Sequence, residues 1–296
     1  MKSFKKNATF AAFAVLSSVP SDAATISYSS NVAGSDYAVG TNWNGGSIPG
    51  TTPGDGGLIN ANKSTTVSSV ITTNPASLQI QNALGTATIN VTTGGSLTTS
   101  STNVGHNRTG TVADGIGVLN ITGGTYSGGT VIVGNAGIAE GIINVSGAGT
   151  FNFGTMTVDR IAGTKGTINV TGSSASINGT SMTLNDNAFL NFTLGSAGVA
   201  SISLSNAFTL NALANLSIDA SLYAGGVGII DLVTFATNTG TTWNSVAINN
   251  LDPAYAGVVK FDTDSMYLEI SPIPEPSAFV LLGLSVMGFT ATRRRR

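Results

Sequence analysis

One short pattern recurs along the middle of this chain and restricts the folds that it can adopt. An asparagine with an apolar residue on each side, as in Ile-Asn-Val, occurs at Asn90, Asn120, Asn144, Asn169 and Asn191. Successive asparagines are 30, 24, 25 and 22 residues apart, and a glycine follows each of them within a few residues. Self-similarity at such a period indicates a repeat architecture, in which one structural unit stacks on the next.

A second element follows each asparagine, partway to the next repeat. Its five members are centred on Val104, Val133, Val158, Leu184 and Leu204. Alternation with a period of two directs the apolar residues of a strand to one face and the polar residues to the other. We therefore predict an all-β, right-handed parallel β-helix (solenoid) with coils about 4.8 Å apart. Asn120, Asn144 and Asn169 should stack on its outside, above a core that contains Val145.

Two other all-β architectures fit the repeat less well. The blades of a β-propeller repeat after about 40 residues, which is longer than the spacing found here. A β-sandwich does not repeat one short sequence in register along the chain. Both remain alternatives to the solenoid.

The composition supports a folded body without disulfides or a zinc site. Charged residues make up 9% of the chain, and the 38 glycines punctuate strands that are rich in Thr, Ser, Asn and Val. A hydrophobic content of 41% is enough for a core, which a disordered linker would lack. The chain has no cysteine and a single histidine, so the usual zinc ligands are missing.

The N-terminal segment, 1–23, has the features of a secretory signal peptide. Lys2, Lys5 and Lys6 precede an apolar stretch over residues 8–19, and small residues stand at Ser21 and Ala23. This order of a basic, an apolar and a small-residue region predicts cleavage by signal peptidase after Ala23 and export of the remainder.

The C-terminal segment, 272–296, carries a second targeting pattern. Three prolines, at positions 272, 274 and 276, precede an apolar run over 278–292 and four terminal arginines. The prolines should keep their segment extended and outside any sheet or helix. The run is shorter than the stretch of about 20 residues that a comfortable membrane span needs. It also lacks the polar face of a core helix. The arginines would stay on the cytoplasmic side.

This tail resembles the PEP-CTERM sorting signal of Gram-negative bacteria. The resemblance implies a hydrophobic sorting helix that anchors the chain transiently in the membrane, and cleavage by an exosortase-type membrane protease. The alternative is a plain C-terminal membrane anchor. The expected sorting-signal residues are Pro274, Glu275, Pro276, Arg293, Arg294, Arg295 and Arg296.

A second resemblance concerns the body of the protein. The segment Asn42-Trp43-Asn44-Gly45-Gly46-Ser47-Ile48-Pro49-Gly50 is similar to the opening that precedes β-strand repeats in autotransporter-like surface proteins. Trp43 is expected to close the open end of the solenoid. The predicted segments are a signal peptide (1–23), an N-terminal cap with irregular coils (24–85), the repeats (86–212), a C-terminal β cap (213–271) and the sorting signal (272–296).

The charge of the exported body argues against nucleic acid as a partner. Without its two ends the chain keeps five basic and twelve acidic residues, a balance of about −7. Binding to nucleic acid depends on clustered Lys and Arg, which release counterions from the phosphates.

One group of residues could support chemistry. Asp159 and Arg160 follow the second element of one coil, and Asp186 follows that of the next. Stacked turns would place the two carboxylates about 5 Å apart, a distance compatible with glycoside hydrolysis. The alternative is a set of solvated surface charges. His106 and the pair Asp262 and Asp264 lack the neighbours that a catalytic or calcium site needs.

These observations favour a structural or adhesive protein of the cell surface or of the extracellular polysaccharide (biofilm) matrix. We expect no catalytic, cofactor-binding or metal-binding residues in the body. The expected partners are signal peptidase, an exosortase and extracellular polysaccharide. The alternative is a carbohydrate-active enzyme on a β-helix, a polysaccharide lyase or hydrolase.

Overall fold

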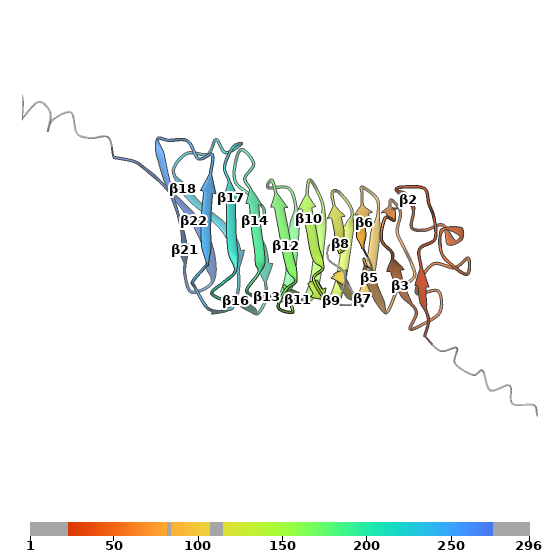
Figure 1. The fold of residues 1–296 in the computed structure, drawn as a ribbon. Coiled ribbons are helices and arrows are strands. Elements are labelled where there is room, and N and C mark those ends of the chain that lie inside the picture. Colours follow the sequence, from red (N-terminus) through yellow and green to blue (C-terminus); the bar gives the residue numbers. More distant parts are fainter. Residues whose placement is uncertain (1–22, 82–83, 107–114, 275–296) are drawn as a thin grey trace, which may run out of the picture.

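The structure is a computed structural model that describes residues 23–81, 84–106 and 115–274. This part of the chain is all-β, with a single turn of 3-10 helix at Gly40–Asn42, and it forms a β-solenoid of about eight turns (Figure 1). The predicted fold class is therefore confirmed at the level of a parallel β-solenoid. The predicted helices at the two termini lie outside the described residues.

The strands alternate along the chain between two sheets. The first, which we call the asparagine sheet, contains in spatial order β2 (Ser35–Asp36), β4 (Ser64–Val67), β6 (Gly85–Val91), β8 (Gly115–Ile121), β10 (Glu140–Ser146), β12 (Lys165–Thr171), β14 (Ala188–Thr193), β17 (Asn215–Asp219) and β20 (Ser245–Asn249). All its neighbouring strands are parallel, because each coil adds its strand beside the strand of the coil before.

The second sheet, which we call the bent sheet, carries the other strand of each coil. Its order is β1 (Thr25–Ser27), β3 (Gly56–Ile59), β5 (Ser77–Ile80), β7 (Ser96–His106), β9 (Thr125–Ala136), β11 (Thr150–Val158), β13 (Ser176–Leu184), β15 (Ile202–Leu204), β18 (Gly228–Thr234), β22 (Ser265–Pro272) and β21 (Tyr255–Phe261). Two further strands belong to this sheet: β16 (Ala207–Leu210) pairs with β13, and β19 (Thr237–Thr239) pairs with β16.

The long strands of the bent sheet change direction midway. In β9, Tyr126 and Gly128 face the core before the bend, and Val131 and Val133 face it afterwards. The two residues between them, Gly129 and Thr130, are both exposed, so the period-two alternation breaks at this point. Each long strand therefore contributes to two faces of its coil.

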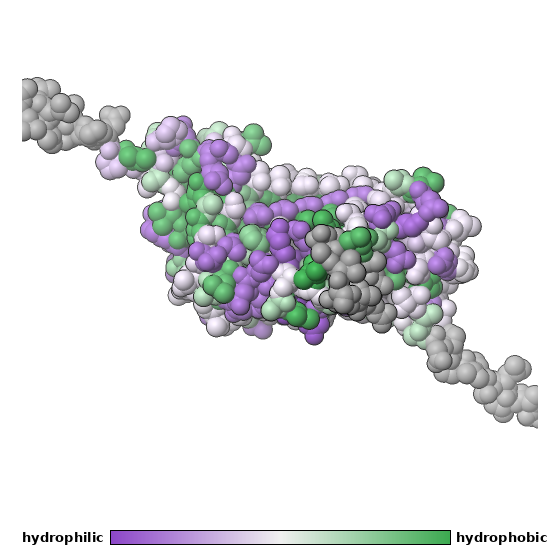
Figure 2. All heavy atoms as spheres, in the orientation of Figure 1, coloured by the Kyte–Doolittle hydropathy of each residue, from purple (hydrophilic) through white to green (hydrophobic). Residues whose placement is uncertain are grey.

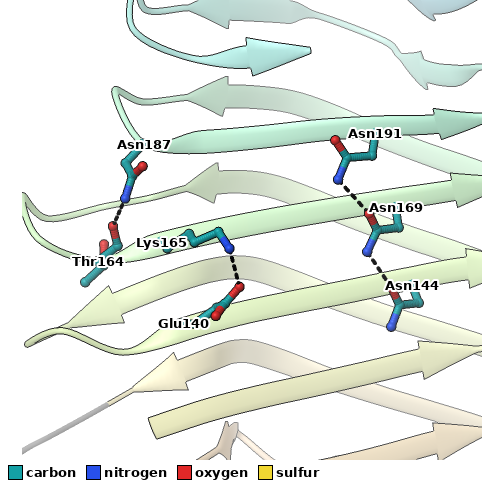
Figure 3. Close-up of polar contacts among 7 residues, drawn as sticks. All are labelled: Glu140, Asn144, Thr164, Lys165, Asn169, Asn187 and Asn191. Carbon is teal, nitrogen blue, oxygen red and sulfur yellow. Dashed lines mark hydrogen bonds and ion pairs between the residues drawn. The ribbon is translucent and has the colours of Figure 1, made fainter. Parts of the chain in front are cut away.

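The repeat asparagines form a single column on the outside of the asparagine sheet, as predicted. Asn90, Asn120, Asn144, Asn169 and Asn191 are register partners on successive strands. Each amide after Asn90 donates from Nδ2 to Oδ1 of the asparagine one coil earlier, over 2.7–2.8 Å. Figure 3 shows the bonds that join Asn144, Asn169 and Asn191. Such a column satisfies its own hydrogen-bonding groups and also fixes the register of the sheet.

The core beneath this column is a stack of β-branched and aromatic residues. Ile121, Val145 and Val170 are register partners, and all three are fully buried. Phe192 and Ile218 continue the stack on the next two strands. The alternation read from the sequence thus gives the correct inside and outside for these strands.

One predicted strand assignment is wrong. The repeat pattern places Leu204 after Leu184 in the column of second elements, but the register partner of Leu184 is Leu210. Leu204 instead pairs with Gly179, because β13 lies against two short strands, β15 and β16, that are separated by a turn. The patterns around Leu204 and Leu210 both alternate apolar and polar residues, so periodicity alone does not separate them.

An aromatic cluster lies at the N-terminal end. Trp43 is only 2% exposed, and its ring meets Tyr28 and Tyr37 edge-on with centroid distances of 4.9 and 4.8 Å. The indole Nε1 donates to the carbonyl oxygen of Tyr37 over 2.9 Å. A buried tryptophan normally finds a hydrogen-bond partner of this kind.

The C-terminal end departs from the parallel pattern. The strand β22 pairs antiparallel with β18 on one side and with β21 on the other. The prediction that Pro272 stays outside any sheet is wrong, because this proline is the last residue of β22 and lies opposite Tyr255. A proline at the end of a strand removes a hydrogen-bond donor only where the ladder is ending, which makes this position tolerable.

Candidate functional site

The predicted sorting residues fall almost entirely outside the described part of the chain. Pro274 is described, and it is exposed just beyond the end of β22. The other six, Glu275, Pro276 and Arg293 to Arg296, lie beyond the described residues. Between residues 23 and 274, no described helix has the length and hydropathy needed to cross a membrane.

The candidate catalytic residues lie at a column of turns that follows the bent sheet. The chain turns with positive φ at Gly105, Gly134 and Asp159, with φ values of 73°, 74° and 60°. Aspartate and asparagine tolerate this conformation better than most residues with a side chain. Asn185 and Asn211 continue the column. Asn185 donates from Nδ2 to the carbonyl oxygen of Asp159 over 2.8 Å, and Asn211 donates to Oδ1 of Asn185 over 2.7 Å.

Asp159 is buried, which corrects the expectation of a surface charge. It is 4% exposed, and both of its carboxylate oxygens accept hydrogen bonds. Oδ1 accepts from the hydroxyl of Thr164 over 2.6 Å, and Oδ2 accepts from the backbone N–H of Asn187 over 2.8 Å. Asn187 in turn donates to the carbonyl oxygen of Thr164 over 2.6 Å (Figure 3). The carboxylate therefore joins two successive turns of the solenoid.

Arg160 and Asp186 are exposed beside this buried carboxylate. Arg160 donates from Nη1 to Oδ1 of Asn135 over 3.1 Å, which ties it to the previous coil. Together with Asp159, the two side chains line a hollow of about 360 Å³, whose other walls include Asn185 and Asn187. Within the described ranges the ion pairs are Lys165 with Glu140, over 2.8 Å (Figure 3), and Lys260 with Glu269.

The three predicted residues lie together around the hollow. The hydrogen bonds of Asp159, however, hold two successive turns of the solenoid together. Glycoside hydrolysis needs two carboxyl groups that face each other across the scissile bond. Here one of the two carboxyls already accepts a hydrogen bond at each oxygen. The described residues contain no group of three or more His, Cys, Asp or Glu side chains that could hold a metal ion.

We expect Asp159→Asn to lower the free energy of unfolding by about 1–3 kcal/mol, because one buried donor loses its acceptor. Asp186→Asn, one coil away and exposed, should change it by less than about 0.5 kcal/mol. Urea unfolding of the purified protein followed by circular dichroism measures both values. Equal, small effects of the two variants would contradict a structural role for Asp159.

A buried hydroxyl cluster was not anticipated from the sequence. The hydroxyl of Tyr126 lies 2.6 Å from Oγ1 of Thr102 and 3.3 Å from Oγ1 of Thr99, and the two threonines are 2.7 Å apart. All three residues are buried in the core, and burial raises the pKa of Tyr126 to about 12. A phenol with a raised pKa and no access to solvent is a poor nucleophile or base, so the cluster satisfies polar groups inside the coil.

The aromatic residues that could have bound sugar are mostly in the core. Phe151 and Phe153 are buried and pack with a centroid distance of 5.2 Å. Trp243 and Tyr255 are half-buried and pack against the core near the C-terminal end. The described aromatic side chains therefore do not form an exposed row along the solenoid.

One outer surface of the bent sheet carries stacked hydroxyl groups instead. We call it the hydroxyl face. One of its columns runs through the register partners Thr157, Thr183, Thr209 and Thr239, and the column beside it through Ser101, Thr130, Thr155 and Ser181. Within the described part of the chain, the hydroxyls of Thr157, Thr183 and Thr209 take part in no hydrogen bond. The similar sequences Thr155-Met156-Thr157 and Ser181-Met182-Thr183, with a hydroxyl residue on each side of a methionine, were the available sign of this surface.

The hydroxyl face differs chemically from the asparagine column. The amides of the column already donate and accept along the solenoid axis, whereas the hydroxyls of Thr157, Thr183 and Thr209 form no hydrogen bond within the described part of the chain. Neighbouring coils place them about 4.8 Å apart along the axis, and alternate residues place them about 6.6 Å apart along a strand. The face thus presents an uncharged, regular set of donors and acceptors.

Comparison with known proteins identifies one segment of the chain. The family model for the PEP-CTERM protein-sorting motif matches residues 272–296, as the terminal proline, apolar and arginine pattern predicted. The motif implies export to the cell envelope or surface and processing by an exosortase. No curated protein and no solved structure matches the chain.

Proposed function

We propose that this chain is a structural or adhesive protein of the cell surface or extracellular polysaccharide matrix, and that it is not an enzyme. The observation that carries the proposal is the hydroxyl face, because its open groups repeat along the solenoid. Signal peptidase would remove residues 1–23, and an exosortase would cut near the proline motif. The mature chain would then reach the surface of a Gram-negative cell.

The chemistry of the hydroxyl face suits a neutral polysaccharide. Each hydroxyl can both donate and accept a hydrogen bond, as can each hydroxyl of a sugar. The residues Thr155, Thr157, Thr183 and Thr209 carry no charge, and the mature body as a whole is acidic. A strongly anionic polymer would be repelled by that net charge. When many weak contacts repeat along one polysaccharide chain, each contact raises the effective concentration for the next. The overall affinity can therefore be high without a deep pocket.

The two ends support a role as a stable rod. We propose that the cluster of Trp43, Tyr28 and Tyr37 closes the N-terminal end, and that the antiparallel strands β22 and β21 close the other. Terminal units of a solenoid need such closure, because open strand edges and core residues would otherwise promote aggregation.

The test is a binding measurement on the secreted protein. The chain is purified from the culture or from the cell surface, and the polysaccharide that co-purifies is identified and titrated back. The triple variant Thr157→Ala, Thr183→Ala and Thr209→Ala should bind at least about tenfold more weakly, since each lost hydrogen bond is worth about 0.5–1.5 kcal/mol. The matched control replaces Ser146, Thr171 and Thr193, a hydroxyl column of the asparagine sheet, by alanine and should bind normally.

Mass spectrometry of the same material tests the processing step. The secreted form should lack Arg293 to Arg296. An intact C-terminus in the culture medium would contradict exosortase processing, and equal binding by the two triple variants would contradict the hydroxyl face as the adhesive surface. If the unmodified protein cleaved the polysaccharide and the Asp186→Asn variant did not, that result would favour the alternative of a carbohydrate-active enzyme at the hollow beside Asp159.

A further inference from the structure

The outer surface of the solenoid changes character at its C-terminal end. Along most of the bent sheet the outward positions before the bend hold Thr98, Ser127, Asn152, Asn178 and Ser203, which are register partners. In the terminal antiparallel strands, Ile229 of β18 and Val258 of β21 take outward positions, on either side of Glu269 in β22. These two side chains are 66% and 50% exposed.

Two further apolar residues extend this surface toward the exit of the chain. Val227 precedes Ile229 by two residues and is 58% exposed, and Ile273 follows β22 and is 50% exposed. The backbone N–H of Ile273 donates to the carbonyl oxygen of Ala254 over 2.9 Å, which fixes the exit beside β21. We call Val227, Ile229, Val258 and Ile273 the terminal apolar patch. In Figure 2 hydrophobic residues reach the surface at this end of the solenoid, near the point where the C-terminal trace leaves.

Three charged side chains lie beside the patch, and two of them form an ion pair; the third, Asp231, is exposed two residues after Ile229 on β18. Glu269 lies between Ile229 and Val258 on the same face and forms an ion pair with Lys260. The hydrogen bond and charge of Glu269 raise the pKa of Lys260, and the two opposite charges of the ion pair offset each other. A neutralised pair hinders the approach of an apolar surface less than an isolated carboxylate would.

The length of the tail limits how far this patch can lie from a membrane. As an α-helix the apolar run over 278–292 is about 22 Å long, whereas the hydrocarbon core is about 30 Å thick. If the arginines are held at the cytoplasmic boundary, such a helix would begin about 8 Å below the outer boundary. A stretch as long as that from Ile273 to Ala278 reaches at most about 18 Å when fully extended, so Ile273 would then lie within about 10 Å of the hydrocarbon.

We propose that the terminal apolar patch rests on the outer surface of the cytoplasmic membrane while the tail is inserted. The patch meets the layer where lipid headgroups and acyl chains join, and apolar side chains there gain the free energy of leaving water. The proline motif then lies at the membrane surface, where a membrane protease can reach it. This inference rests on the transient membrane anchor that the sorting signal implies and on the exosortase cleavage in the proposed function.

The experiment uses the absence of cysteine from the chain. The full chain carrying Glu275→Gln, which should block cleavage, is reconstituted into vesicles of phosphatidylethanolamine and phosphatidylglycerol. A single cysteine is introduced as Val258→Cys or, as the matched control on an outward strand position in mid-solenoid, as Thr155→Cys. Each carries a polarity-sensitive fluorophore, and lipids with a nitroxide at a shallow acyl position act as the quencher.

We expect the probe at position 258 to be quenched severalfold more strongly than the probe at 155, with emission shifted to the blue. Adding Ile229→Asp should reduce that quenching while the chain stays resistant to carbonate extraction. Equal, weak quenching at both positions in an inserted chain would overturn the inference and leave anchoring intact. Extraction by carbonate would overturn anchoring and the inference together. Energy transfer between differently labelled copies, without lipid quenching, would assign the patch to self-association and overturn the membrane contact.

Discussion

Replacing Val145 by aspartate is expected to unfold the solenoid or to destabilise it by about 4 kcal/mol or more. Val145 is fully buried and lies between Ile121 and Val170 in the core stack, so a carboxylate there has apolar neighbours on both sides. Such a loss is a large part of the roughly 5–15 kcal/mol that typically stabilises a domain. Urea unfolding and the yield of secreted protein measure the effect.

Two comparisons make this expectation specific. Ser146→Asp places the same charge one residue along β10, on the outward side, and should cost less than about 1 kcal/mol. Deleting residues 141–165 joins Glu140 to Gly166, which is the register partner of Gly141, so one whole coil is removed and β12 can take the place of β10. Because coils contact only their neighbours, the deletion should be tolerated better than Val145→Asp. If Val145→Asp proved as stable as the deletion, the assignment of this core stack would be wrong.

Replacing Gly141 by alanine should also be severe, at about 3 kcal/mol or more. A Cβ on Gly141 would lie 2.2 Å from the carbonyl oxygen of Val104 and 2.5 Å from the backbone nitrogen of Gly134. Both are main-chain atoms, and a side-chain rotation cannot move them. Gly117 and Gly166 are the register partners of Gly141 on the neighbouring strands, so three successive coils use a glycine at this close approach.

The control is a glycine with free space around it. Gly228 begins β18 with ordinary φ, and a Cβ there would have no heavy atom within 4 Å beyond its chain neighbours. Gly228→Ala should therefore be neutral or stabilising by about 0.4–1 kcal/mol, through the lower entropy of the unfolded chain. Thermal unfolding of both variants provides the comparison. Similar melting temperatures would mean that the backbone near Gly141 adjusts more easily than the structure indicates.

The solenoid could be predicted because its repeat combines two independent signals. The regular spacing of the asparagines gives the size of a coil, and the alternation around Asn120 and Asn144 gives the inward and outward sides. Hydrogen bonding between register partners then makes the asparagine column a direct consequence of the alignment. The sorting motif was equally accessible, since it depends on linear order alone.

The features that were missed depend on the context of each residue. Asp159 reads as a surface charge, and its burial depends on Thr164 and on Asn187 of the following turn. Leu204 and Leu210 have equivalent local patterns, and only the pairing with β13 distinguishes them. The antiparallel end reached by Pro272 likewise depends on pairing that no short sequence pattern encodes.

The shared register of the coils also sets how such a protein can vary in size. Duplicating one coil in the gene would add a strand to each sheet, one more amide to the asparagine column and about 4.8 Å to the height of the rod. Neither end would change, because each insertion copies an interface that already exists. The length of the rod would then change in fixed steps of one coil, and the two ends would stay the same at every length.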